Sequence, residues 1–191
     1  MLVIEGGGGA PDQIVFGDHA NDFSPTAAND LRDTTAGNRT NVELQLASLG
    51  AGAGAQSAKF DFGALRAERY HIKAAIEWAA GIDAGETIRL FLAPSHSATV
   101  GTANPGGVSG VKGAYAGYSS NLTDAVQQLM PIGTMRMTAQ ATATIQIIDV
   151  DDFSPPERYG SLVVVNDADD VLHSDDVEMH IVFQPIVAEL Q

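Results

Sequence analysis

Histidines are the residues best suited to bind a transition metal in this sequence, which contains no cysteine. There are five of them: His19, His71, His96, His173 and His180. No two show the HxH, HxxxH or HExxH spacing that would place two imidazoles on one metal ion. The spacing favours surface or interface positions for these side chains and predicts no metal site built on them.

Carboxylates offer a second kind of chemistry, because hard cations such as calcium need several oxygen ligands. The stretch 149–178 contains ten Asp or Glu and one basic residue. Three of the acids occupy positions one, three and twelve of a calcium-binding loop: Asp167, Asp169 and Glu178. Val171 and Leu172 stand where that loop needs a ligand and a glycine. We therefore expect solvated turns with no metal or cofactor, and the alternative is a calcium site at Asp149, Asp151, Asp152 or the group around Asp167.

Signatures of enzymes are incomplete. Around Ser109 the sequence reads GVSGV, which lacks the second glycine of a GxSxG nucleophile elbow. Residues 110–113 read GVKG and lack the GK[ST] ending of a phosphate-binding loop. We predict that the protein is not an enzyme and has no catalytic residue.

Composition narrows the choice of partners. The 191 residues carry 10 Lys or Arg against 24 Asp or Glu, a formal charge of −14, which repels phosphate backbones and anionic lipid headgroups. Neither nucleic acid nor a membrane is expected as a partner. No apolar run is long enough to span a bilayer, and the first residues do not read as a secretion signal. With 18% charged residues against roughly 25% in an average soluble domain, part of the surface is expected to be covered by other molecules.

The elements that must position any site are mostly strands. Residues 69–79 alternate, with Tyr70, Ile72, Ala74, Ile76 and Trp78 on one face and mostly polar residues on the other. Turn residues at 81–85 then lead to Ile88, Leu90 and Leu92, the expected hairpin partner of the first strand. Further strands are expected at 13–16, 41–47, 57–62, 134–138, 142–147, 161–166 and 177–184. The aliphatic run 161–166 is predicted to be covered on both faces or to form an interface.

The segment 94–120 contains many glycines and no apolar period, so it is expected to be a long functional loop. Two aromatic residues in it, Tyr115 and Tyr118, are candidate interface contacts because a ring with a hydroxyl suits a protein interface. After the loop, Asn121 is expected to cap a short helix that ends before Pro131. Trp78 could stack on a sugar ring, but its place on the apolar face of a strand favours the core.

About eight short antiparallel strands with one short helix predict an all-β fold, an antiparallel two-sheet sandwich of jelly-roll type. We expect two parts: an extended N-terminal arm at 1–40 and the sandwich at 41–191. The arm begins with the aliphatic residues Leu2, Val3 and Ile4, which precede the glycine run 6–9. These three are candidate contacts with another subunit, and a loose tail is the alternative.

Several segments carry a resemblance to a known family. They are FSPPERYGSLVV at 153–164, HSDDVEM at 173–179, FQPIV at 183–187, APSHSAT at 93–99 and NPGGVSG at 104–110. Over roughly residues 60–191 the chain resembles small virion proteins of tailed bacteriophages, and most of all a jelly-roll capsid decoration (cement) protein. The resemblance implies a homotrimer that binds the major capsid protein on the outer surface of the virion, after assembly in the host cytoplasm.

The sequence therefore predicts a structural virion protein that binds and stabilises a capsid. A carbohydrate-binding sandwich, either a free module or a phage host-recognition or fibre protein, is the alternative.

Overall fold

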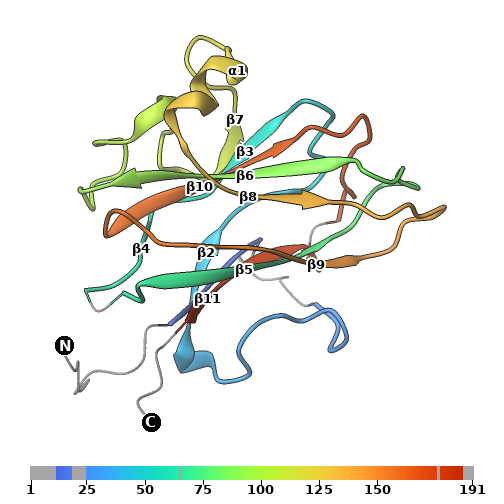
Figure 1. Cartoon of the computed structure of the whole chain (residues 1–191), viewed down its shortest axis with the longest axis horizontal. Coiled ribbons are helices and arrows are strands. Elements are labelled where there is room, and N and C mark those ends of the chain that lie inside the picture. The colour runs from blue at the N-terminus through green and yellow to red at the C-terminus, as the bar shows by residue number, and fades with distance from the viewer. Residues whose placement is uncertain (1–11, 19–24, 65, 176, 187–191) are drawn as a thin grey trace.

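The computed structural model describes residues 12–18, 25–64, 66–175 and 177–186. Two β-sheets lie face to face and enclose the main hydrophobic core (Figure 1). The first sheet has the strand order β2-β1-β11-β5-β9, with bounds Arg39–Glu43, Gln13–Gly17, His180–Ile186, Arg69–Ile76 and Gln146–Phe153. The second has the order β7-β3-β10-β6-β8, with bounds Gly113–Tyr115, Gly54–Gln56, Tyr159–Asn166, Thr87–Ser95 and Met130–Arg136. A two-residue strand, β4 (Phe60–Asp61), also pairs with β10.

The described pairings are antiparallel except for the parallel pair β1–β2. This arrangement confirms an all-β sandwich, as the alternating patterns predict. Among the described residues, helical structure is limited to α1 (Leu122–Ala125) and three short 3-10 turns, η1 (Ala36–Asn38), η2 (Pro105–Gly107) and η3 (Val126–Gln128). None of the helices in the described ranges is long and apolar enough to cross a membrane.

Aromatic side chains from both sheets join the core. The ring of Phe16 on β1 lies edge-on to Phe60 on β4, with centroids 4.9 Å apart, and to Phe183 on β11 at 4.7 Å. Edge-to-face pairs of this kind add to the free energy gained by burying the rings. All five residues of the predicted apolar face of β5 and its extension are buried, including Trp78, so Trp78 belongs to the core and is not a sugar platform.

The predicted hairpin between β5 and the strand after it is wrong. β5 pairs with β9 and β11, whereas β6 lies in the other sheet and pairs with β8 and β10. The turn at 81–85 therefore connects β5 in one sheet to β6 in the other. In both strands the predicted face is buried, because the alternation of apolar residues is the same whether the two strands pair with each other or lie in different sheets.

The segment 1–40, expected to be an arm, contains β1, which is an interior strand of the first sheet. Gln13–Gly17 are all buried between β2 and β11. The described part of the segment that follows, 25–38, packs on the outer side of this sheet. There the side-chain amide of Gln13 donates to the carbonyl of Leu31 at 2.9 Å and accepts from the N–H of Asp33 at 2.7 Å. β1 and the described residues 25–38 thus belong with the sandwich.

Candidate functional site

A second hydrophobic cluster lies on the outer face of the β6–β10 pair. Alternate residues of β10, Val163 and Val165, face away from the main core and pack with Phe91, Ala93, Val108, Tyr115, Ala125, Val126 and Leu129. The run 161–166 is therefore covered on both faces, one of the two expected outcomes. The cluster fixes the segment 105–129, including α1, on the outside of this sheet (Figure 1).

Within this segment the two tyrosines differ in their exposure to solvent. Tyr115 is 3% exposed, and its hydroxyl donates to the carbonyl of Gly106 at 2.6 Å. Burial raises the pKa of Tyr115. Its ring is part of the protein's own interior, which corrects the expectation that it is available to a partner. Tyr118 packs against Gly107, but the residue is 51% exposed, so its ring remains accessible.

A single lysine organises the loop between β6 and η2. The ammonium group of Lys59 donates hydrogen bonds to Ser95 Oγ and to the carbonyls of Ser97, Thr99 and Thr102, at 3.0, 3.0, 2.9 and 2.8 Å. Its backbone N–H donates to the carbonyl of Gly110 at 2.9 Å. Burial lowers the pKa of Lys59. The residue thus anchors two turns of the long loop at once, and no acid takes part.

Gln56 on β3 holds the next part of the loop. Its side-chain oxygen accepts the backbone N–H of Ser109 at 2.9 Å, and its side-chain nitrogen donates to Ser109 Oγ at 2.8 Å. The two anchored turns touch, since a methyl group added at Gly110 would lie 3.5 Å from the backbone nitrogen of Gly101. Val100 and Val111, the direct chain neighbours of these glycines, are both more than half exposed. The loop is therefore a fixed surface that presents aliphatic groups.

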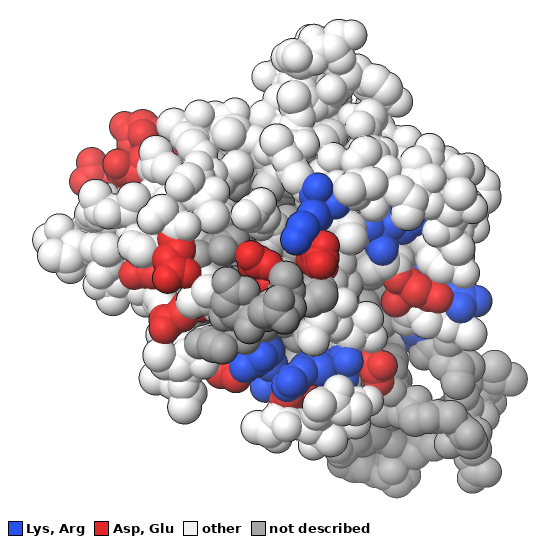
Figure 2. Space-filling model, turned by 180° about the vertical axis from the view of Figure 1, so that it is seen from behind, with Lys and Arg blue, Asp and Glu red and all other residues white. Residues whose placement is uncertain are grey.

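We call the surface formed by residues 96–120 the neutral face. Its one Lys, Arg, Asp or Glu is Lys112, and the ammonium of that residue lies 3.2 Å from a carboxylate oxygen of Glu43. Figure 2 shows no Lys, Arg, Asp or Glu on the projecting end in the view from behind. The helix α1 beside the neutral face contains one exposed acid, Asp124. Val100, Val111 and Tyr118 are the large exposed hydrophobic side chains of this face among the described residues.

Three of the acidic residues near the C-terminus, Asp149, Asp152 and Asp167, form ion pairs. Asp167 binds the guanidinium group of Arg89 in a two-point contact, with one bond of 2.8 Å. On β9, Asp149 and Asp152 bind His71 on β5, and Asp152 also binds Arg69 at 2.7 Å. No cluster of three His, Asp or Glu suited to a metal ion occurs in the part of the chain that the structure describes. Asp149 and Asp152 stabilise the pairing of β5 with β9, which spacing alone did not indicate.

Leu2, Val3 and Ile4 lie outside the described residues. Of the five candidate interface residues, the structure thus leaves Tyr118 on the surface and places Tyr115 inside. Comparison with known proteins adds no relative, since no family model and no curated protein matches the chain.

Proposed function

We propose that this protein is a non-enzymatic structural protein of a tailed-bacteriophage virion, a jelly-roll decoration protein that binds the outer surface of the capsid as a homotrimer. The observation that carries the proposal is the neutral face, a fixed surface that displays aliphatic and aromatic side chains on a molecule with a formal charge of −14. The family resemblance of the sequence supplies the kind of partner.

Strand pairing supports the jelly-roll part of the proposal. With β2, β4 and β7 set aside, the other eight strands numbered in chain order follow the orders 1-8-3-6 and 2-7-4-5. The first pairs with the last, the second with the seventh, the third with the sixth and the fourth with the fifth, all antiparallel. An antiparallel ribbon wound around a core produces this pattern, and jelly rolls of this type occur in viral capsid proteins and lectins. Because the fold serves both functions, the site must decide between them.

The neutral face has the properties of a protein-binding surface. Charged residues are depleted at the centre of such interfaces and aromatic residues are enriched. Anchoring by Lys59 and Gln56 holds the loop in one conformation, so that little conformational entropy is lost on binding. A trimer would present three such faces to a shell, and the linked contacts would raise the overall affinity. The excess of acidic groups would face outward and keep particles apart.

The proposal is tested by adding the protein to capsids that lack it and measuring occupancy by co-sedimentation. Tyr118→Ala and Val111→Ser should each weaken binding about tenfold, since a buried interface contact of this size contributes roughly 1–2 kcal/mol. Ile147→Ser is the matched control, because Ile147 on β9 is 49% exposed and lies outside the neutral face. Equal binding by all three variants, or no binding by the unmodified protein, would refute the proposal.

Tyr118 also favours a second function, carbohydrate binding, because an exposed ring can stack on a sugar. A glycan array decides between the two. Saturable binding that is lost in Tyr118→Ala, together with no binding to capsids, would favour the carbohydrate-binding module.

A further inference from the structure

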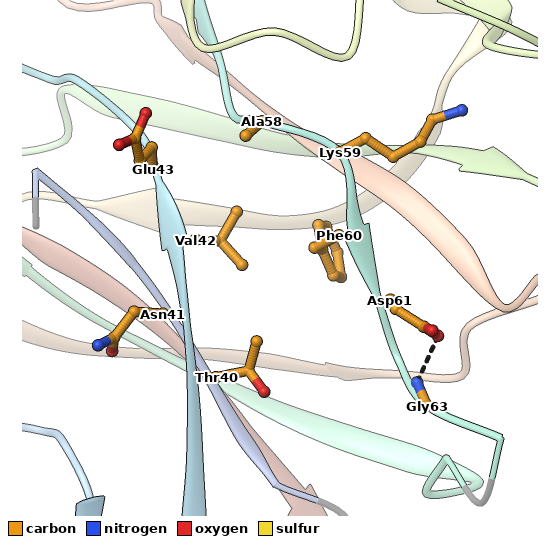
Figure 3. A pocket seen from close by; sticks show the side chains of 9 residues that line it. All are labelled: Thr40, Asn41, Val42, Glu43, Ala58, Lys59, Phe60, Asp61 and Gly63. Atoms are coloured by element: carbon orange, nitrogen blue, oxygen red, sulfur yellow. Dashed lines mark hydrogen bonds between the residues drawn. The ribbon is translucent and has the colours of Figure 1, made fainter. Parts of the chain in front are cut away.

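The two sheets are joined along one edge by a backbone hydrogen bond, and next to this bond they separate. The backbone N–H of Ala58 donates to the carbonyl of Glu43 at the end of β2, at 2.9 Å. Below this bond β2 and β4 border an open groove of about 440 Å3 (Figure 3). Val42 and Phe60 point into it, each 5% exposed, while Thr40, Asn41 and Asp61 line its rim.

One wall of this groove is a strand edge that has no pairing partner among the described residues. In the described part of the sheet β2 is the last strand, and its other side pairs with β1. Leu44 donates to Gly17 on the β1 side, whereas the Glu43 carbonyl points to the β4 side. Because successive residues of a strand direct their backbone groups to opposite sides, Asn41 points its N–H and C=O into the groove. No backbone hydrogen bond from β4 reaches Asn41 among the described residues.

The chain enters the described structure at the open end of the groove. Asp12, the first described residue, accepts a hydrogen bond at 3.4 Å from the hydroxyl of Thr40, which lines the groove. Ahead of Asp12 the sequence places the aliphatic residues 2–4 and then seven residues, 5–11, that include the glycine run 6–9. Seven residues span up to about 23 Å, and adjacent strands lie only about 4.8 Å apart.

We propose that the groove is the docking site of Leu2–Ile4 from the same chain, which lie antiparallel to β2 and extend that sheet by one strand. Leu2 and Ile4 then face Val42 and Phe60, and the backbone of Val3 pairs with that of Asn41. Strand addition of this kind satisfies the free backbone groups, while the alternate side chains enter the apolar groove. The short connection gives the segment a high effective concentration over its own groove, which favours it over another copy. This inference does not depend on the proposed capsid function.

Amide hydrogen exchange of the full chain tests the docking. The Asn41 amide is expected to be protected, because it would be bonded to the docked segment. In the double variant Leu2→Asp/Ile4→Asp it should exchange at least tenfold faster. The amide of Leu44, which bonds to Gly17 instead, serves as the internal control and should not change. An Asn41 amide that exchanges equally fast in both proteins would overturn the proposal.

A disulfide experiment identifies which copy supplies the segment, and it is free of interference because the chain has no cysteine. Val3→Cys/Asn41→Cys should oxidise to an intramolecular disulfide with a mass loss of about 2 Da, since directly opposed residues have the separation that a disulfide requires. Val3→Cys/Ile147→Cys places the second thiol on β9, at the far end of the sheet, and should remain reduced. Disulfide-linked dimers from the first variant, or equal oxidation of both variants, would overturn the proposal.

Discussion

The imidazole of His180 accepts the backbone N–H of Leu31 through Nε2 at 3.0 Å, and its Nδ1 lies 2.9 Å from the carbonyl oxygen of Glu178. This pair of contacts requires a neutral ring with its proton on Nδ1. His180 is fully buried, and desolvation is the main cause that lowers its pKa, helped by Arg32 and opposed by the Glu178 carbonyl and by Asp30. The residue thus holds the segment around Leu31 on the outer side of its sheet only while it is uncharged.

Acid should therefore destabilise the fold through His180. Because the folded pKa is lower than the unfolded value of about 6.5, the unfolded chain binds the proton first, and stability is lost as pH falls through that range. Urea unfolding of the unmodified protein and of His180→Gln between pH 7.5 and 5.5 is expected to show this loss as the difference between the two, since other histidines contribute equally to both. His180→Gln removes this titratable group and should reduce the dependence of the free energy of unfolding on pH. His96→Gln, at an exposed position, should not reduce it. An unchanged slope in His180→Gln would contradict this account.

His71 should behave in the opposite way. Its Nδ1 lies 2.7 Å from Asp152 and its Nε2 lies 3.1 Å from Asp149, and only the protonated ring donates from both nitrogens. The hydrogen bond to Asp152, followed by that to Asp149, raises the pKa of His71. The resulting stability is present below pH 6.5 and is lost as pH rises through the folded pKa.

An NMR titration of the His71 ring measures this effect. The midpoint is expected above 6.5, and Asp152→Asn should lower it. Asp151→Asn changes an exposed neighbour on the same strand and should leave the midpoint in place. A midpoint below 6.5 in the unmodified protein would show that the two carboxylates do not hold the ring in solution.

Replacing Lys59 by Met should loosen the loop 95–110 without unfolding the sandwich. The substitution keeps the aliphatic stem but removes the donors to Ser95, Ser97, Thr99 and Thr102, at a cost of about 1–2 kcal/mol. Limited proteolysis is expected to cut within this loop. Lys73→Met is the control, because the ammonium of Lys73 has one ion pair, with Asp149 at 3.4 Å. Equal cleavage of both variants would rule out the anchoring role.

The turn before Tyr118 offers a test of close packing. Gly117 has φ +71, and a methyl group added there would lie 2.5 Å from the side chain of Ala125 and 2.6 Å from the carbonyl oxygen of Asn121. Gly52 has nearly the same φ, +67, but nothing within 4 Å. Both changes to Ala should cost about 1 kcal/mol from the left-handed backbone, and Gly117→Ala roughly 1–3 kcal/mol more from overpacking. Urea denaturation that gives equal losses would contradict the packing around α1.

Local patterns predicted faces of strands better than their partners. Alternation marks which residues of β5 and β6 are buried, but both patterns fit a hairpin and a crossing between sheets equally well. The strand order is decided by the packing of the whole chain, so the error about the hairpin could not be corrected from the segment alone.

The pattern also failed where a polar group is buried. In the expected strand 142–147 the apolar residues Ala143, Ile145 and Ile147 alternate with polar ones, which predicts that Ile147 is buried; yet Ile147 is exposed and Gln146 is buried. The amide of Gln146 accepts from the N–H of Thr138 at 3.0 Å and donates to the carbonyl of the same residue at 2.9 Å. Such bonds make burial of a polar side chain favourable, and they depend on a partner eight residues away that no periodicity reveals.

In the candidate site, the glycine-rich segment 94–120 was predicted from its composition, because a long stretch without periodic apolar residues is typical of a loop. The anchors of that loop were missed because they are distant in the sequence and belong to no motif: Gln56 lies on β3, and Lys59 lies between β3 and β4. Tyr115 was misplaced because its hydroxyl finds a partner, the Gly106 carbonyl, inside the second cluster.

Quantitative mass spectrometry of purified virions, with heads separated from tails, tests the capsid proposal most directly. We expect the chain on the heads, in a fixed ratio to the main shell protein that corresponds to complete trimers. Its absence from heads, or its recovery with the tails alone, would contradict the account.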